Sequence, residues 1–285
     1  MNEEVKIRKL HAADAVHGLR LSTQAGWNQT ISEWNLILND PNSICLGAVF
    51  DDQIIASAAA LNYSPGFYWI AMVLTDINYR NRGISKKLLN NLLKLIDDQS
   101  LIKLDATPLG VGLYSQFGFV EENKIIRFIH HPTISLPIGK HQNIRIAAGE
   151  DYKLVIRYDM AQFGADRSVL FNWLQLQFPG YTYVVGENEE ITGFVCGREG
   201  RNFTHLGPLL SIEISHALEL VKYALSSNHS KPVIVDVPEY HDEFIRWLES
   251  NGFTRQREFI RMYKNKNAYS ATLQVQYLIA GPEFG

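Results

Sequence analysis

Two arginines and a glycine stand at the start of an amphipathic segment, "INYRNRGISKKLLNNLL", which spans residues 77–93. The first four backbone N–H groups of a helix lack an intrahelical acceptor, and the helix dipole places roughly +0.5 charge at that end. An acidic first turn would be usual, whereas Arg80 and Arg82 add positive charge and Gly83 removes a side chain. Amides and arginines together bind phosphate groups. The segment predicts an anion site, with a solvated basic turn as the alternative.

A second copy of the pattern provides an internal comparison. The motifs "LDATP" and "VDVPE" place Asp105 and Asp236 on equivalent strands, with 236 − 105 = 131. The same offset carries Asp76 onto Gly207, at the predicted end of each fourth strand, and it replaces "RNRGIS" with "SIEISH". A glutamate in that position would repel a phosphate. We therefore expect the anion site in the first half only.

A tyrosine precedes a Gly-Phe pair in "LYSQFGF". Aligning this pair with the one in the second half, with 252 − 118 = 134, places Leu248 opposite Tyr114. A phenol can protonate a departing thiolate as a general acid, whereas a leucine can only fill the same space. The sequence therefore predicts Tyr114 as an acid, with a packing tyrosine on a short helix as the alternative.

The elements that must position these residues occur in the same order in both halves. Hydrophobic periodicity and breakers predict strands at 4–10, 44–50, 53–61, 67–75, 101–105 and 119–129, with helices from about residue 12, from 30 to before 41, after 83, and at 109–117. The second half predicts strands at 143–147, 202–207, 233–237 and 253–263, a hairpin turning at 187–189, and helices at 151–176, 212–225 and 239–250. A polar, proline-containing segment at 130–142 separates them, which predicts domains at 1–132 and 141–285.

The first half resembles the GNAT superfamily of N-acetyltransferases, most strongly over residues 5–129. "RNRGIS" after the strand "IAMVLT" resembles the family signature R/Q-x-x-G-x-G/A, and "LDATPLGVGLYSQFGF" resembles its later motif. Ser85 stands where the family has Gly or Ala. The second half resembles a diverged GNAT fold, as in tandem members. The resemblance implies an α+β (mixed α/β) fold class, with two tandem domains that each have a mostly antiparallel sheet flanked by helices.

The resemblance also implies a cofactor, acetyl-CoA. Its pyrophosphate would bind the loop residues Arg80, Asn81, Arg82, Gly83, Ile84 and Ser85, and its pantetheine arm would lie in an opening between the fourth and fifth strands, beside Met72, Val73, Leu74 and Thr75. Tyr114 occupies the place of the family's acid. We expect an N-acetyltransferase that acts by direct attack of a small-molecule primary amine, with the second domain shaping the acceptor site. The alternatives are a non-catalytic coenzyme A sensor or partner-binding module and, less favoured, transfer to a protein amino group.

The acceptor side is less clearly marked. Trp27 and Asn28 precede the second helix in a segment that borders the acceptor pocket of the GNAT fold, although Trp27 fits a core position equally well. Asp166 could hold a cationic acceptor, but an Asp166–Arg167 pair at a helix start is the more ordinary reading.

No residue is clearly marked as the base that deprotonates the amine. Asp76 is a candidate, or it orients the arginine loop. Glu33 fits the second position of a capping box in "TISE", and His130 and His131 fit a solvated linker as well as a titrating pair.

Composition narrows the class of protein. The chain of 285 residues is 46% hydrophobic and 20% charged, with a formal net charge of -3, which indicates a globular protein without affinity for nucleic acid or anionic membranes. Cys45 and Cys196 lack the spacing of a zinc site and lie in apolar runs, which favours buried thiols and no metal. No run approaches the roughly 18 apolar residues of a membrane span. We expect a cytoplasmic monomer or homodimer.

Overall fold

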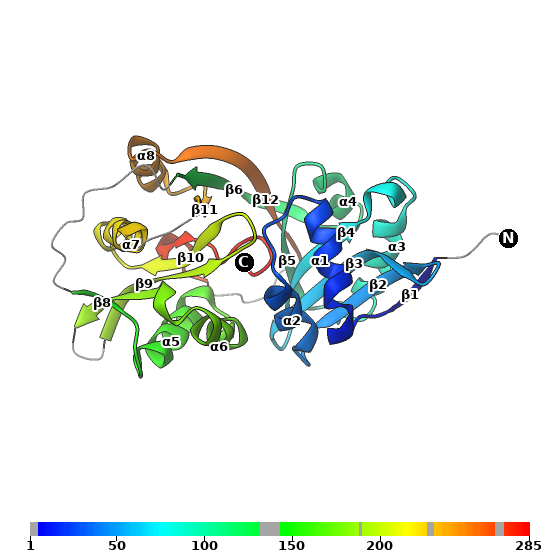
Figure 1. The fold of residues 1–285 in the computed structure, drawn as a ribbon, viewed down its shortest axis with the longest axis horizontal. Coiled ribbons are helices and arrows are strands. Elements are labelled where there is room, and N and C mark those ends of the chain that lie inside the picture. Colours follow the sequence, from blue (N-terminus) through cyan, green and yellow to red (C-terminus); the bar gives the residue numbers. More distant parts are fainter. Residues whose placement is uncertain (1–4, 132–142, 188–189, 227–230, 266–270) are drawn as a thin grey trace. The chain divides into compact units, whose positions relative to one another are not determined.

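The computed structural model describes residues 5–131, 143–187, 190–226, 231–265 and 271–285. The chain folds into two compact units, coloured mainly blue to green and green to red in Figure 1. The first unit comprises residues 1–105, 109–121 and 262–267, and the second comprises 106–108, 122–261 and 268–285.

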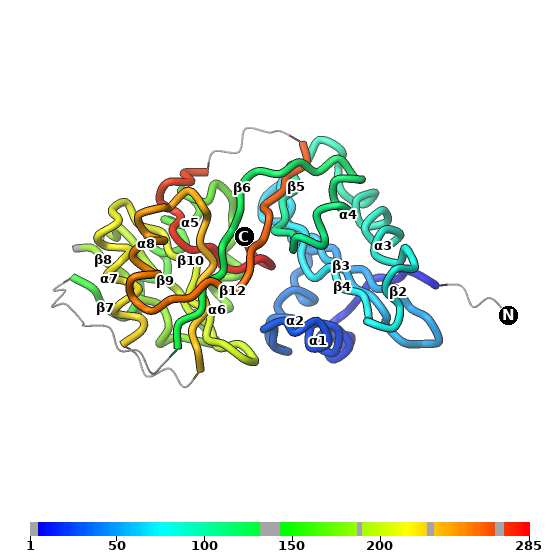
Figure 2. The backbone as a smooth tube through the Cα atoms, turned by 90° about the horizontal axis from the view of Figure 1, so that it is seen from above, coloured from blue at the N-terminus to red at the C-terminus, as the bar shows by residue number. Residues whose placement is uncertain are grey.

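The first unit contains a mixed sheet with strand order β1-β2-β3-β4-β5, in which β4 and β5 are parallel and the other pairs are antiparallel. The strands are β1 (Lys6–Lys9), β2 (Ile44–Phe50), β3 (Gln53–Ser64), β4 (Phe67–Thr75) and β5 (Leu101–Ala106). The helices are α1 (Ala15–Gln24), α2 (Ile31–Asn39), α3 (Ile84–Leu93) and α4 (Val111–Ser115), with short 3₁₀ turns at Ala12–Asp14 and Ile77–Tyr79. Figure 2 shows α1 and α2 on one face of this sheet and α3 and α4 on the other.

Local sequence explains how the helices of the first unit begin and pack. Thr30 caps α2 as predicted: its Oγ1 accepts a hydrogen bond from the Glu33 N–H at 3.3 Å, and Glu33 Oε2 accepts from the Thr30 N–H at 2.7 Å. In α3, Leu88, Leu89 and Leu92 lie on one helical face and are fully buried. The apolar face therefore fixes α3 against the sheet and leaves its first turn at the end of β4.

The second unit repeats the arrangement with strand order β6-β11-β10-β9-β8-β7 and with β13 beside β10. Its strands are β6 (Val120–His130), β7 (Ile144–Ile146), β8 (Thr182–Glu187), β9 (Glu190–Glu199), β10 (Thr204–Ser211), β11 (Val233–Pro238), β12 (Thr254–Lys264) and β13 (Gln276–Leu278). Its helices are α5 (Asp151–Phe163), α6 (Ser168–Gln177), α7 (Ile214–Ser226) and α8 (Asp242–Ser250), with 3₁₀ turns at Pro179–Tyr181 and Leu273–Val275. The mixed α/β fold class predicted from the sequence is confirmed.

The two units exchange strand residues. From residue 122 onward, β6 belongs to the second unit, where it pairs antiparallel with β11 and aligns Arg127 with Asp236. The last residues of β12, from Met262, belong to the first unit. The sequence places the strand at 119–129 in the first domain because it directly follows the Gly-Phe motif, and pairing with a strand a hundred residues away leaves no local signal. The predicted boundary residues 132 and 141 lie outside the described residues and stay predictions, as does the turn at residues 188 and 189.

The fourth strand of the second unit differs from its prediction. The sequence predicted an end at Gly207, but β10 continues to Ser211, and α7 begins at Ile214. Gly207, at φ +143°, lies inside the strand where the register shifts between Leu206 and Leu209. Glycine and proline are usual strand terminators but also occur at bulges, which explains the wrong prediction. The true equivalent of Asp76 at the strand end is therefore Ser211.

Candidate active site

The first unit has a splayed parallel strand pair at one end of its strand order. The parallel strands β4 and β5 pair through Phe67–Trp69 and Leu101–Lys103, and β4 then continues to Thr75. In the described chain, no further residues of these two strands are paired with each other. The edge of β4 from Ile70 onward therefore offers backbone groups to an opening, which is the shape that the sequence resemblance implied.

A bulge bends β4 within this opening. Ser57 pairs with Leu74 and Ala59 with Ala71, so that three steps along β4 match two along β3. Met72 has a φ of +52° and is only 2% exposed. A left-handed conformation costs a residue with a β-carbon roughly 1–2 kcal/mol, so the surrounding structure must hold the bulge in place. The side chains of Met72 and Leu74 are buried, whereas those of Val73 and Thr75 are partly exposed, and the backbone of residues 72–75 forms the edge of β4 that diverges from β5.

The loop after β4 is anchored by Asp76. Its carboxylate accepts hydrogen bonds from Arg20, from the Asn78 N–H at 3.0 Å and from Gln24 Nε2 at 3.3 Å. Burial alone raises the pKa of Asp76, but these hydrogen bonds outweigh it and hold the pKa below its ordinary value. A carboxylate held ionised in this way is a poor proton acceptor. The contacts favour the loop-orienting role of Asp76 over the role of base.

The loop presents its arginines and amides at the entrance of α3. Arg80 Nε donates to the Thr75 carbonyl at 3.3 Å and Arg82 donates to the Asn78 carbonyl at 3.1 Å, while both side chains stay exposed. Gly83, at φ +74°, is the N-cap residue and provides no side-chain cap. Within the described chain, no backbone carbonyl accepts a hydrogen bond from the N–H groups of residues 80–86. This concentration of unpaired amides and positive charge suits a phosphate group.

Two further loop residues complete the predicted cofactor set. Asn81 has a φ of +61°, a conformation that asparagine tolerates better than most residues. Ser85 Oγ lies 2.7 Å from Thr75 Oγ1, which ties the first turn of α3 to the end of β4. The serine that departs from the family signature is therefore accommodated by a hydrogen bond.

Tyr114 is buried on the short helix α4. Its ring packs edge-on against Phe119, with centroids 6.0 Å apart and planes at 69°, and its carbonyl accepts from the Phe119 N–H at 3.3 Å. Burial raises the pKa of the Tyr114 phenol. The phenol therefore keeps its proton well beyond neutral pH, as a proton donor requires.

The candidate acceptor residues are divided between the units. Trp27 and Asn28 are half-buried on the loop between α1 and α2, where the Trp27 N–H donates to the Ser22 carbonyl at 2.9 Å. Asp166 belongs to the second unit and accepts from the Ser168 N–H at 2.8 Å at the start of α6.

Two other expectations concern ionisable side chains. The predicted Asp166–Arg167 pair is replaced by a buried Asp159–Arg167 pair at 2.6 Å. The reason is that Arg167 turns into the core, whereas Asp166 faces outward as a cap. Of the two linker histidines, His130 is buried against Phe253, with ring centroids 4.7 Å apart, and burial lowers its pKa, whereas His131 is exposed.

The equivalent opening in the second unit is occupied by the chain itself. Strands β10 and β11 pair through Thr204–Leu206 and Val233–Val235, and β13 then pairs with β10 at Leu209 and Leu210. On the other side, the Ile279 N–H donates to the Asp236 carbonyl at 3.0 Å. A β-carbon on Gly207 would lie 2.1 Å from the Ile279 carbonyl oxygen, so the inserted segment requires glycine there.

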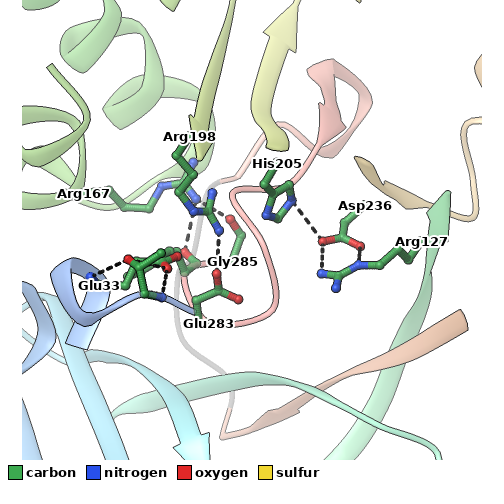
Figure 3. Close-up of polar contacts among 10 residues, drawn as sticks. Glu33, Arg127, Arg167, Arg198, His205, Asp236, Glu283 and Gly285 are labelled. Carbon is green, nitrogen blue, oxygen red and sulfur yellow. Dashed lines mark hydrogen bonds and ion pairs between the residues drawn. The ribbon is translucent and has the colours of Figure 1, made fainter. Parts of the chain in front are cut away.

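Buried arginines hold the residues that follow β13, as Figure 3 shows. Arg198 forms an ion pair with Glu283 at 2.5 Å, and Arg167 donates to the carbonyl of Gly285. Both arginine side chains are almost fully buried. Sequence reasoning missed this arrangement, because isolated arginines in "GREG" and "ADRS" carry no signal for a distant partner.

A second buried cluster joins β6, β10 and β11 (Figure 3). Arg127 donates to both carboxylate oxygens of Asp236, at 2.7 and 2.6 Å, and His205 Nε2 lies 3.1 Å from Asp236 Oδ2. Burial alone raises the pKa of Asp236, but the Arg127 charge and hydrogen bonds outweigh it and hold that pKa well below its ordinary range. The carboxylate is a structural anion that ties the exchanged strand β6 to the second unit.

The remaining site features of the second unit are also changed. Only residues 212 and 213 separate β10 from α7, whereas residues 76–83 separate β4 from α3. Leu248 is the equivalent of Tyr114, because its carbonyl accepts from the Phe253 N–H at 3.1 Å in the same way, and Gly252 matches Gly118 with φ values of +85° and +82°. The alignment of the two Gly-Phe pairs is therefore confirmed.

The described residues contain no group of three or more His, Cys, Asp or Glu side chains suited to a metal ion. Cys45 and Cys196 are both buried and unpaired with each other, as the sequence predicted. No helix in the described ranges is both long and apolar enough to span a membrane.

Both halves of the chain match family models. Residues 13–119 match one described as "Acetyltransferase (GNAT) family", and residues 155–278 match one described as "Acetyltransferase (GNAT) domain". A curated relative, the uncharacterized N-acetyltransferase YitH of Bacillus subtilis, is 24% identical over 265 residues, which cover 91% of this chain and 92% of that protein.

Solved structures share the fold at low sequence identity. A putative acetyltransferase from Pyrococcus horikoshii gives a TM-score of 0.80 at 18% identity and covers 99% of this chain and 96% of that one. A tandem GNAT protein from the clavulanic acid biosynthesis pathway gives a TM-score of 0.66 at 11% identity, covering 92% and 98%.

Proposed function

Because the chain belongs to the GNAT superfamily, with one domain of that family in each half, we propose that its first unit is an acetyl-CoA-dependent N-acetyltransferase. The observation that carries the proposal is the combination of open strand pair, arginine loop and buried Tyr114 in one unit only. The second unit retains the fold, but its opening is filled and its loop and tyrosine are lost. Its proposed role is to shape the acceptor site.

The proposed reaction is direct attack on a thioester. A neutral primary amine adds to the acetyl carbonyl, the C–N bond forms, and the C–S bond breaks. Tyr114 gives its proton to the departing thiolate of coenzyme A. Burial raises the pKa of the phenol, so this proton is still present at neutral pH. The amine loses its own proton to solvent or to a base. Loop amides and arginines hold the pyrophosphate and so bring the thioester to the bulge of β4.

The proposed acceptor is a small-molecule amine, with Trp27 and Asn28 bordering its site. The half-buried indole of Trp27 provides an apolar or cation-binding wall. Transfer to a protein amino group requires a long open groove and is the less favoured variant. We assign the reaction to the cytoplasm, where the buried thiols of Cys45 and Cys196 stay reduced.

One observation favours a second candidate function, a non-catalytic coenzyme A sensor. Asp76, the base candidate beside the loop, is tied to Arg20 and held ionised as an anchor. A sensor needs the phosphate loop but no base. The buried phenol of Tyr114 argues for the enzyme, since binding alone does not require a proton donor.

Two measurements separate these functions. Calorimetry with coenzyme A tests for one binding site per chain, and a thiol-release assay with acetyl-CoA and a panel of polyamines, amino sugars, amino acids and arylamines tests for transfer. The enzyme predicts binding and turnover with at least one class of amine. Binding without turnover supports the sensor, and absence of binding rejects both.

A further inference from the structure

Ser57 lies on β3 directly beside the bulge in β4. It is 1% exposed, and its Oγ donates a hydrogen bond to the Met72 carbonyl oxygen at 2.8 Å. A bulge leaves the extra residue without a ladder partner, so the backbone of β3 does not supply this donor. The serine hydroxyl takes its place and holds Met72 at a φ of +52°.

This hydrogen bond fixes the orientation of one peptide plane. In a trans peptide, the C=O and the N–H of the same unit point in opposite directions. Since the Met72 carbonyl points toward β3, the Val73 N–H points away from β3, to the side on which β5 has diverged. A backbone donor therefore faces the opening at the point where the strand bends.

We infer that Ser57 is a positioning residue for acyl transfer: it holds the Met72–Val73 peptide so that the Val73 N–H donates to the thioester carbonyl oxygen. The inference rests on the proposed function. As the amine adds, that oxygen gains negative charge, which the N–H stabilises until the C–S bond breaks and sulfur takes the Tyr114 proton. Loss of one such donor lowers kcat by roughly 10²–10³-fold, and misalignment of the donor costs less than its loss.

The second unit has an equivalent bulge, in β10, that forms without a serine hydroxyl. In the second unit Leu209 pairs with Val195, and in the first unit Leu74 pairs with Ser57. Val195 is therefore the equivalent of Ser57, and its side chain has no hydroxyl. The bulge there is formed at Gly207, which adopts a positive φ without help. A bulge can therefore form without this hydroxyl. The hydroxyl is present in the unit where the Val73 N–H must be oriented toward the opening.

Infrared spectroscopy tests this without knowledge of the acceptor amine. The probe is acetyl-CoA labelled with ¹³C at the thioester carbonyl, bound to the wild type and to Ser57→Ala. We expect the carbonyl band to move to lower wavenumber in the wild type and to lose most of that shift in Ser57→Ala, while the Kd for coenzyme A changes less than about twofold. Ser57→Thr keeps the hydroxyl and restores the shift. Where an acceptor is known, kcat falls about tenfold in Ser57→Ala with KM for acetyl-CoA nearly unchanged.

Ser43→Ala is the matched control, because it removes another buried hydroxyl of the first unit, one that donates to Asp40 in the turn between α2 and β2. It leaves the carbonyl band as in the wild type. An unshifted band in the wild type, or an equal shift in Ser57→Ala, overturns the inference while the proposed function stands. Failure of the wild type to bind coenzyme A overturns both.

Discussion

The two copies of the fold differ most at the same place, the splayed end of the parallel strand pair. In the first unit, β4 bends away from β5 and leaves backbone groups facing an opening. In the second, β13 pairs with β10 inside the equivalent opening and Ile279 bonds to β11. A splayed sheet exposes backbone donors and acceptors that need partners. The first copy leaves this edge of β4 without a strand partner, and the second satisfies the equivalent edge with its own chain.

The losses in the second copy are coordinated. The loop between strand and helix shrinks from residues 76–83 to residues 212 and 213, and Leu248 replaces Tyr114. If the pantetheine arm of coenzyme A cannot enter the second unit, a loop that binds its pyrophosphate is no longer required there. A general acid is not required either, because there is no leaving thiolate to protonate. The comparison indicates that the elements of the proposed site act as one functional set, because the second copy keeps the sheet and its helices without them.

Replacement of the proposed acid, Tyr114, is expected to have the largest effect on activity. Tyr114→Phe keeps the packing against Phe119 but removes the proton donor, and general acids contribute roughly 10²–10⁴-fold to rates. We expect kcat to fall at least about 100-fold with little change in KM for acetyl-CoA, measured by thiol release. Because the pKa of Tyr114 is raised, its ionisation does not lower the wild-type rate below about pH 10.

Tyr68→Phe removes a phenol at the start of β4, where it receives a hydrogen bond from Asn62 at 3.4 Å, and serves as the control with unchanged kcat. Full wild-type activity of Tyr114→Phe at every pH would return Tyr114 to a packing role.

The inserted strand of the second unit is expected to be structural. Leu278 is fully buried within the core of that unit, and Leu→Ala substitutions at such sites cost roughly 2–5 kcal/mol. We expect Leu278→Ala to lower the free energy of unfolding of the second unit by about 3 kcal/mol, measured by urea denaturation, while the Kd for coenzyme A stays unchanged. Leu95→Ala, at an exposed leucine, is the control and changes stability by less than about 0.5 kcal/mol. Loss of coenzyme A binding by folded Leu278→Ala would show that the second unit takes part in the cofactor site.

The residue before α3, Gly83, can be replaced by the glutamate that precedes α7 in the second unit. Since α3 begins at Ile84 and α7 at Ile214, Gly83 corresponds to Glu213. Gly83→Glu places a carboxylate among the loop amides, and its β-carbon meets open space, so charge and the φ of +74° account for the effect. We expect the Kd for coenzyme A to rise on the order of 100-fold by calorimetry. Gly83→Asn, which tolerates the left-handed conformation, separates strain from charge and changes Kd only a few-fold. Equal losses in both variants would refute the electrostatic explanation.

Much of this comparison was predictable from local sequence. The capping box at Thr30, the arginine loop before α3 and the Gly-Phe pairs each depend on residues close together in the chain, and the structure contains the expected turns. Period-3.6 patterns predicted most helices because a helix buries one face, and apolar runs between breakers predicted most strands, including β10 and β11, which are buried on both faces. Physical effects confined to a few neighbouring residues are readable from one sequence.

Most of the errors have a different cause. The exchange of β6, the insertion of β13 and the Arg198–Glu283 pair all join residues far apart in the chain, and such pairings leave no periodic trace. Gly207 was misplaced because glycine before proline indicates a strand end as readily as a bulge. Ser57 was missed because a serine within "IIASAAAL" differs little from its alanine neighbours until the Met72 carbonyl is seen beside it.

The smallest expected effect concerns acid stability of the second unit. His205 is buried, and burial together with the nearby Arg198 charge lowers its pKa although Asp236 opposes the shift. Burial likewise lowers the pKa of His130 and of His241 in the same unit. These rings take up protons at a lower pH in the folded protein than in the unfolded chain, where histidine titrates near pH 6.5. The unfolded state therefore binds more protons just below that pH, and stability falls as the pH is lowered.

Each such histidine contributes at most about 1.4 kcal/mol per pH unit in this window. Asp236 does not affect the slope between pH 7 and pH 5.5. Because its pKa is lowered in the folded protein, its contribution to stability is lost only as the pH falls below the ordinary value of 3.8. We expect the free energy of unfolding of the second unit to fall between pH 7 and pH 5.5 and the slope to lessen by about one proton in His205→Asn, measured by urea titration at each pH. A slope identical to the wild type would mean that His205 is already protonated beside Asp236. The cluster would then be a charged triad, and His205 would not contribute to the acid sensitivity of the second unit.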